Sequence, residues 1–189
     1  MNNKHDIRKK YLSIRAAIDD ATQKVASDTI CQHIQTLNAY QTAQHIGFYH
    51  AVGKEVCLKP LQLNAELEHK HTYLPVIQPQ GTLLFIKYQN QDPLVQNLFC
   101  IQEPIAAHQK PFPMEELDLL LVPLVAFDNH GTRLGRGKAY YDKTLLIAKP
   151  KKLIGVAYAC QSYPDILPRN EWDIPLDAIV TENAVQWFN

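Results

Sequence analysis

One glycine-containing loop, Arg133-Leu-Gly-Arg-Gly-Lys-Ala-Tyr-Tyr-Asp142, holds the residues with the clearest chemical potential. Gly135 and Gly137 allow the backbone to approach a ligand closely. Arg136 and Lys138 add full positive charges, and a guanidinium can hold two phosphate oxygens at once. The loop follows an apolar run and opens a helical pattern, where backbone N–H groups and the helix dipole favour an anion. It therefore indicates a site for an oligophosphate.

The spacing of this loop matches neither common nucleotide fingerprint. A Walker A loop requires G-x-x-x-x-G-K-S/T, and a dinucleotide loop requires glycine where Tyr140 stands. A surface turn with solvated charges is the alternative. Asp142 is either a helix-terminal residue that pairs with arginine or a magnesium ligand beside phosphates. It is the only acid among the basic residues between positions 129 and 152, which are Arg133, Arg136, Lys138, Lys143, Lys149, Lys151 and Lys152, so we predict one basic patch.

Elements on both sides must position this loop. Positions 117–127 are apolar at ten of eleven positions with Pro123 included, which predicts a strand buried on both faces. A loop over 128–138, a helix over 139–149 and a second buried strand over 153–159 complete a βαβ unit. Further upstream, 45–49 is predicted as a strand, and 50–55 as the loop at its carboxyl end.

The remaining segments complete an α/β pattern. A basic amphipathic helix is predicted over 4–18, with Ile7, Tyr11, Ile14 and Ile18 on one stripe, and a second helix over 22–37. A hairpin is predicted from 72–77 and 82–88, an irregular segment with at most one short strand from 92–114, and a last strand from 177–181. We predict one domain over residues 1–189, with a three-layer Rossmann-like fold and a mostly parallel sheet flanked by helices.

Composition narrows the function classes. The 189 residues carry 19 basic and 19 acidic side chains, so no global field favours nucleic acid or an anionic membrane. The four cysteines are scattered, which argues against a zinc pattern or a disulfide scaffold. The segment 1–15 lacks an apolar leader, and no apolar stretch approaches a membrane span. We expect a cytoplasmic monomer that binds a small molecule and neither nucleic acid nor membrane.

The loop 133–142, preceded by the apolar segment 118–128, resembles the signature of the 5-formyltetrahydrofolate cyclo-ligase family, also called methenyltetrahydrofolate synthetases. Weaker pieces of the resemblance occur in the same order along nearly the whole chain. They are Lys4-His-Asp-Ile-Arg8, Gly53-Lys-Glu55, Ile101-Gln-Glu-Pro104 and Asp173-x-x-x-Asp177-x-x-Val-Thr-Glu182.

The resemblance implies conversion of 5-formyltetrahydrofolate, including polyglutamylated forms, to 5,10-methenyltetrahydrofolate, with ATP and Mg²⁺ as cofactors. It assigns catalytic roles to Arg136, Lys138 and Tyr140, and substrate contacts to His50, Glu55 and Tyr140. It assigns metal binding to Asp142 and Asp173. Nucleotide contacts fall on Lys4, Arg8, Arg133, Leu134, Gly135, Arg136, Gly137, Lys138, Ala139, Tyr140 and Tyr141.

Departures from the family pattern leave a second reading open. Ala139 stands where the family usually has a third glycine, and the loop geometry should survive unless that position requires positive φ. Trp172 and Cys57 also depart, so the alternative is a non-catalytic homologue that binds nucleotide or folate. From the residues alone, a solvated helix face is the favoured interpretation of Lys4 and Arg8, and one of the adjacent tyrosines should lie in the core.

Overall fold

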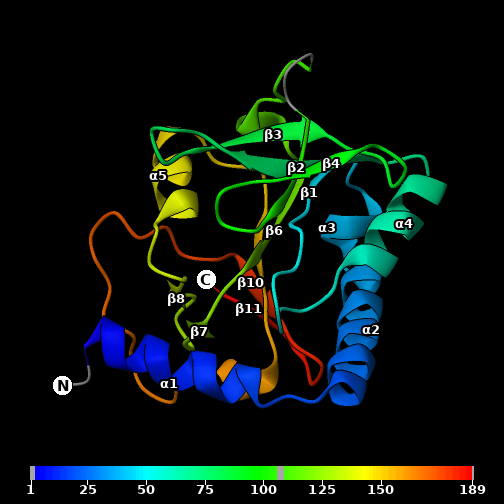
Figure 1. Ribbon diagram of the computed structural model, residues 1–189. Helices are drawn as coiled ribbons and strands as arrows, with labels where there is room; N and C mark the ends of the chain where they lie inside the picture. The colour runs from blue at the N-terminus through cyan, green and yellow to red at the C-terminus, as the bar shows by residue number, and fades with distance from the viewer. Residues whose placement is uncertain (1–2, 106–108, 189) are drawn as a thin grey trace.

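The computed structural model of the chain describes residues 3–105 and 109–188 (Figure 1). Its centre is a seven-stranded sheet of order β11-β10-β9-β6-β1-β2-β3, and the prediction of a mostly parallel α/β fold is confirmed. Five central strands are parallel, whereas β3 and β11 pair antiparallel at the edges. The strands are β1 (His45–Gly47), β2 (His71–Ile77), β3 (Leu83–Lys87), β6 (Leu119–Pro123), β9 (Leu153–Val156), β10 (Ala178–Val180) and β11 (Val185–Trp187).

Strand order reverses between β1 and β6. From β1 the chain adds β2 on one side, whereas β6 is followed by β9 and then β10 on the other side. In open parallel sheets, the crevice outside the carboxyl ends of the strands at such a reversal is the usual ligand site. The loops that leave β1 and β6 therefore meet at the place where a ligand is expected.

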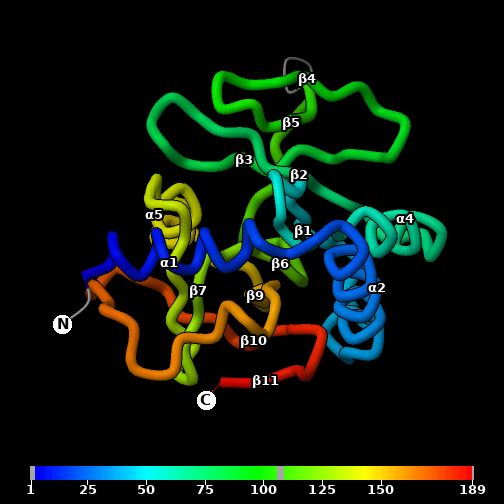
Figure 2. The backbone as a smooth tube through the Cα atoms, turned by 60° about the horizontal axis from the view of Figure 1, so that its bottom comes forward, coloured from blue at the N-terminus to red at the C-terminus, as the bar shows by residue number. Residues whose placement is uncertain are grey.

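Helices cover both faces of this sheet (Figure 1). One face carries α2 (Asp20–Thr36), α3 (Asn38–Gln41) and α4 (Lys59–Leu67), and the opposite face carries α5 (Tyr140–Ile147). The first helix, α1 (Lys4–Ala16), begins at the cap residue Asn3, whose side chain accepts from the backbone N–H of Asp6. It crosses the end of the sheet and packs against β7 (Ala126–Phe127), as Figure 2 shows.

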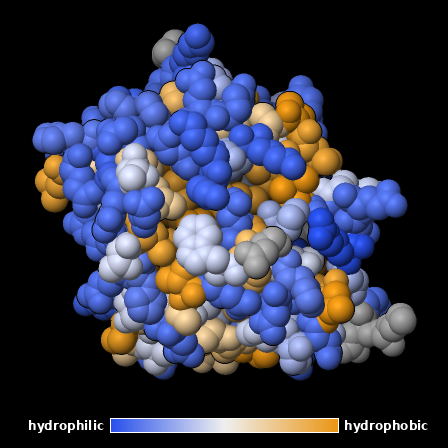
Figure 3. Space-filling model, turned by 180° about the vertical axis from the view of Figure 1, so that it is seen from behind, coloured by the Kyte–Doolittle hydropathy of each residue, from blue (hydrophilic) through white to orange (hydrophobic). Residues whose placement is uncertain are grey.

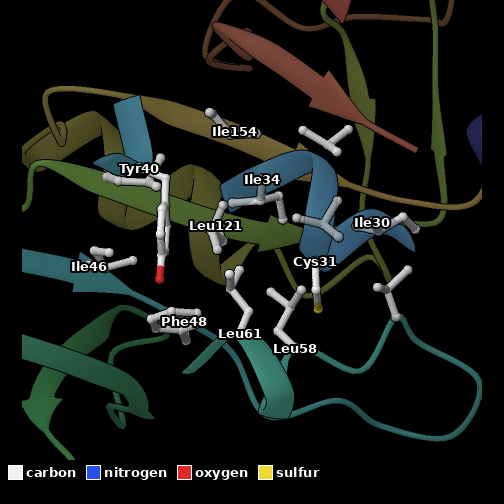
Figure 4. Packing of buried hydrophobic residues seen from close by; sticks show 14 of the residues in the cluster. Ile30, Cys31, Ile34, Tyr40, Ile46, Phe48, Leu58, Leu61, Leu121 and Ile154 are labelled. Carbon is white, nitrogen blue, oxygen red and sulfur yellow. The ribbon is translucent and has the colours of Figure 1, made fainter. Parts of the chain in front are cut away.

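Alternating residues of the strands supply two apolar cores. Leu119 and Leu121 of β6 face α2, where Ile30 and Ile34 are fully buried (Figure 4). Leu120 and Val122 of the same strand belong to the second cluster, which includes Leu145 of α5. Because β6 is buried on both faces, its sequence is continuously apolar, as predicted.

Only part of α5 is covered by the rest of the protein. Its buried residues are Thr144 and Leu145, and the Thr144 hydroxyl accepts from the backbone N–H of Leu83 at 2.8 Å. Leu146 and Ile147 are exposed, and hydrophobic surface appears on the side of α5 in Figure 3. Among the described residues, no helix has the length and apolar character needed to cross a membrane.

The predicted strand over 117–127 is wrong at its carboxyl end. It breaks after Pro123, and β7 instead forms a hairpin with β8 (Arg133–Leu134), inside the predicted loop. Side chains distant in sequence cause the break, because Arg15 and Gln161 both donate to the carbonyl of Leu124. The hairpin carries the chain directly into the glycine-containing loop.

The segment predicted as irregular holds two strands rather than one. β4 (Leu94–Gln96) and β5 (Gln102–Pro104) form a separate antiparallel pair, here called the β4–β5 arm, which spans residues 94–104. Residues 106–108 of that predicted segment lie outside the described residues. Four further elements were not predicted from the sequence: α3, the edge strand β11 and two short 3₁₀ turns at Met114–Glu116 and Ala159–Gln161.

Candidate functional site

A cleft of about 480 Å³ opens beyond the carboxyl ends of β1, β2 and β6. Its walls come from α1, the loop after β1, the end of β2, the β4–β5 arm, the glycine-containing loop and residues 170–173. Every residue assigned a site role from the sequence lines it. These are Lys4, Arg8, His50, Glu55, Arg133, Leu134, Gly135, Arg136, Gly137, Lys138, Ala139, Tyr140, Tyr141, Asp142 and Asp173.

The glycine-containing loop lies against the first helix. Arg8 donates from Nε to the carbonyl of Gly135 at 2.8 Å, although the two residues are 127 positions apart. Gly137 has a φ of +102°, and a Cβ there would lie 3.4 Å from Cζ of Arg8. Arg8 of α1 therefore packs against the glycine-containing loop and lines the cleft, so it is not simply part of a solvated surface.

Ala139 adopts a conformation that favours glycine. Its φ is 56° and its ψ is 24°, at the N-cap of α5, and its side chain supplies no capping hydrogen bond. The loop position that the family usually fills with glycine does require positive φ in this chain. A left-handed conformation costs a non-glycine residue about 1–2 kcal/mol, so the loop carries strain at the start of α5.

Three ion pairs organise the charged half of the cleft. Lys4 Nζ lies 2.8 Å from Asp173 Oδ2, Arg136 Nε lies 3.0 Å from Glu55 Oε1, and Arg133 pairs with Asp142. Arg133 also donates to the carbonyl of Ile174, and its side chain is only 6% exposed. Burial lowers the pKa of Arg133, while Asp142 and then Asp173 act to raise it. Both carboxylates thus lie within the electrostatic reach of one buried guanidinium.

The two predicted metal ligands, Asp142 and Asp173, both line the cleft. Within residues 3–105 and 109–188, no group of three or more His, Cys, Asp or Glu side chains could hold a metal ion unaided. Magnesium, however, is commonly bound by one or two carboxylates while substrate phosphates and water complete the octahedron. Asp142 and Asp173 beside an anion loop fit that requirement.

The other half of the cleft is built around Glu55. Glu55 is 6% exposed, and its Oε2 accepts a hydrogen bond from the backbone N–H of Val52 at 3.0 Å. His50 lies in the same loop, and burial together with Lys59 lowers the pKa of its imidazole, favouring the neutral form. The loop after β1 thus presents hydrogen-bonding groups that can accept from a ligand.

Both adjacent tyrosines line the cleft. The expectation that one of them lies in the core is wrong, because Tyr140 and Tyr141 are each half-buried and pack against the edge of the second core cluster. Burial, followed by the nearby Glu55, raises the pKa of Tyr141 well above that of a free phenol. Its hydroxyl remains protonated at neutral pH and can donate.

The β4–β5 arm adds residues that sequence reasoning did not assign. Phe99 is 48% exposed, lies 5.6 Å beneath the Lys138 ammonium, and has its ring centroid 6.2 Å from that of Tyr140. Glu103 is buried and accepts from Asn97 Nδ2 at 2.8 Å and from the backbone N–H of Ile77 at 2.9 Å. In the sequence, the only signal for these residues was the segment Ile101-Gln-Glu-Pro104 of the family resemblance. The burial of Glu103 could not be predicted, because it depends on contact with β2.

The single basic patch predicted over 129–152 is divided. Lys143, Lys149, Lys151 and Lys152 do not line the cleft. Lys151 pairs with Asp118 at 2.7 Å, and Lys152 lies 3.8 Å from Asp177, next to the amino end of β9. The reason is strand polarity, since α5 returns the chain to the edge of the sheet opposite the cleft. Lys4 and Arg8 of α1 join the loop instead.

Comparison with known proteins gives a consistent result. A profile of the 5-formyltetrahydrofolate cyclo-ligase family matches residues 1–182. The 5-formyltetrahydrofolate cyclo-ligase of Haemophilus influenzae is 38% identical over 177 residues, covering 92% of this chain and 94% of the relative. That of Escherichia coli strain K12 is 35% identical over 178 residues, covering 92% and 97%.

Solved structures resemble the fold over nearly its whole length. The NMR structure of Aquifex aeolicus 5,10-methenyltetrahydrofolate synthetase gives a TM-score of 0.84 at 32% identity, covering 97% of this chain and 92% of that chain. A 5,10-methenyltetrahydrofolate synthetase from Mycoplasma pneumoniae gives a TM-score of 0.77 at 24% identity, covering 96% and 99%, which supports the fold alone.

Proposed function

The chain belongs to the 5-formyltetrahydrofolate cyclo-ligase family, and from this premise we propose that it converts 5-formyltetrahydrofolate to 5,10-methenyltetrahydrofolate, consuming ATP with Mg²⁺ and releasing ADP and phosphate. It is thereby a ligase of folate and one-carbon metabolism. One observation carries the ATP-dependent part of the proposal. The glycine-containing loop, which suits phosphates, and the carboxylate of Glu55, which suits a folate, line the same cleft. A phosphoryl donor and a folate can therefore meet there.

The chemical obstacle is the formyl amide of the substrate. Its oxygen is a poor leaving group and its carbon is a poor electrophile, and phosphorylation of the oxygen corrects both. In the proposed sequence the formyl oxygen attacks the γ-phosphate, and ADP leaves. N10 then attacks the activated formyl carbon and closes the new ring, N10 gives up its proton, and the C–O bond breaks as phosphate departs with that proton. No side-chain nucleophile is required.

Charge and positioning are therefore the main contributions of the protein. Arg136 and Lys138 would stabilise the transferring phosphoryl group, because cations preorganised in a water-poor cleft act strongly on developing charge. Lys4 and Arg8 would hold the nucleotide from α1.

Asp142 and Asp173 are the side chains that would hold Mg²⁺, which when bound would supply positive charge against that of the phosphates. Both carboxylates are paired with cations of the same cleft, Arg133 and Lys4. Each carboxylate could then exchange part of that pairing for the metal. The released ammonium of Lys4 would be available to phosphate.

The folate would occupy the half of the cleft around Glu55. His50 and Glu55 supply acceptors for the N–H groups of a pterin, and Tyr140 supplies an aromatic face between the two ligands. Polyglutamylated forms of the substrate fall within this proposal. We propose that the activity resides in one domain spanning residues 1–189 and that the protein acts as a cytoplasmic monomer without nucleic acid or membrane partners.

The direct test mixes purified protein with 5-formyltetrahydrofolate, Mg²⁺ and ATP, and follows methenyltetrahydrofolate by its near-ultraviolet absorbance. Growth of that band with ATP, and its absence when ATP is omitted, is the expected result. Saturable binding of either ligand without any growth of the band would overturn the proposal and favour the non-catalytic homologue. Reverting Ala139 to glycine would then be the first repair to attempt.

A further inference from the structure

A buried arginine outside the assigned site residues connects the segments that follow β6 and β1, two of the strands whose ends form the cleft. Arg15, in the last turn of α1, is 4% exposed. Its NH1 donates to the carbonyl of Leu124, just after β6, at 3.1 Å. Its NH2 lies 3.6 Å from Oε1 of Glu55, in the loop after β1. The guanidinium is thus fixed from two directions.

Glu55 contacts both Arg15 and Arg136 of the glycine-containing loop. The same oxygen, Oε1, lies 3.0 Å from Arg136 Nε, and Oε2 accepts from the backbone N–H of Val52. The two guanidiniums differ in freedom, because the Arg136 side chain is 47% exposed and that of Arg15 is 5% exposed. Arg136 can rotate into the cleft, whereas Arg15 cannot.

This asymmetry decides what happens to Glu55 when Arg136 leaves. A buried carboxylate that loses its only cation is strongly destabilised and tends to take up a proton. Arg15 stays beside Glu55, so the carboxylate keeps a cationic partner within 3.6 Å. Burial lowers the pKa of Arg15, while the Glu55 carboxylate acts to raise it and Arg136 acts to lower it.

We propose that Arg15 is a positioning residue that holds the Glu55 carboxylate in place while Arg136 transfers from Glu55 to the phosphates of the nucleotide. The proposal rests on the proposed function. Transfer of Arg136 frees one side of Oε1 to accept an N–H of the folate. Each ligand then removes a competitor of the other, so nucleotide and folate bind with positive coupling, for which a factor of roughly 5 to 150 is typical.

The test measures the Kd of 5-formyltetrahydrofolate by calorimetry, with and without a non-hydrolysable ATP analogue and Mg²⁺. For the unaltered protein we expect the analogue to tighten folate binding by about 5-fold or more. Arg15→Met should lose this gain. Arg15→Lys should restore part of it, because a cation remains beside Glu55 even though the fork geometry is lost.

Kinetics give an independent readout. Arg15→Met should raise the KM for the folate by about 10-fold or more, as expected when a buried charge pair that orients a ligand group is lost. The KM for ATP should change much less. Should the methionine variant fail to fold, Arg15→Gln provides the same comparison, because it can still donate to the Leu124 carbonyl but carries no charge.

Tyr11→Phe is the matched control. Tyr11 is another buried residue of α1, and its hydroxyl donates to the Ser162 carbonyl at 2.9 Å, so the variant removes a helix contact without touching Glu55. It should lower the melting temperature and keep the coupling. If Arg15→Met behaves like Tyr11→Phe, Arg15 only anchors the helix and the inference is wrong. If the unaltered protein binds neither ligand, both the proposed function and this inference are wrong. If it binds both ligands without coupling, only the inference is wrong.

Discussion

Arg8 packs directly against Gly137: a Cβ at position 137 would lie 3.4 Å from Cζ of Arg8, and the φ of +102° is a conformation that side chains of L residues rarely adopt. We expect Gly137→Ala to lower the free energy of unfolding by about 1–2 kcal/mol. The added methyl would only contact Arg8, at 3.4 Å from Cζ, so the KM for ATP should change little. Urea unfolding and steady-state kinetics measure both effects.

Gly135→Ala is the control for stability in the same loop. A Cβ at Gly135 meets nothing within 4 Å. It should therefore leave the free energy of unfolding unchanged or raise it by up to about 1 kcal/mol. Equal destabilisation by both alanines would contradict the role given to the positive φ at Gly137.

Ala139→Gly should stabilise the protein. The φ of 56° at the N-cap of α5 strains alanine, and glycine is the better N-cap residue of the two. We expect a gain of about 0.5–1.5 kcal/mol in urea unfolding, with turnover maintained or increased. Ala148→Gly, at the other end of the helix with a φ of −149°, should instead cost about 0.5–1 kcal/mol. A loss of stability in both variants contradicts the strain argument.

Arg136→Ala should reduce kcat by about 100- to 1,000-fold, the effect of losing one preorganised group that stabilises transition-state charge. The fold should persist, because the side chain is half-exposed and Glu55 keeps Arg15. Lys149→Ala removes an exposed basic residue of the same chain segment that lies outside the cleft, and should leave kcat unchanged. Turnover that survives in Arg136→Ala would remove Arg136 from the mechanism.

Asp142→Asn should raise the Mg²⁺ concentration for half-maximal activity by about 10-fold or more, since loss of one charged ligand contact exceeds ~1.4 kcal/mol. It should also lower the melting temperature, because the buried Arg133 loses its paired carboxylate. Asp165→Asn, an exposed acid outside the cleft, should change neither quantity. A lower melting temperature with an unchanged magnesium titration would mean that Asp142 serves only Arg133.

Local sequence signals were enough to predict the parallel sheet and the anion loop. Continuous apolar runs identify β6 and β9 because strands buried on both faces need no polar alternation. The loop is recognisable because its glycines and cations are contiguous. Lys4 and Arg8 were predicted as site residues only from the family resemblance, because the charges of α1 are also typical of a solvated helix face.

Features created by tertiary contacts could not be predicted from local sequence signals. The end of β6 depends on Arg15 and Gln161, and the β4–β5 arm depends on pairing between short, weakly apolar segments. Burial of Arg15 and Glu103 arises from elements distant in the chain. In the sequence, both look like ordinary surface charges.

The most direct test of the account follows the formyl oxygen itself. 5-Formyltetrahydrofolate labelled with ¹⁸O in the formyl group is converted with ATP and Mg²⁺, and the inorganic phosphate is examined by mass spectrometry. Activation through a formyl phosphate predicts one ¹⁸O atom in each phosphate released. Methenyltetrahydrofolate formed with unlabelled phosphate, the label appearing in water, would contradict phosphorylation of the formyl oxygen in this cleft.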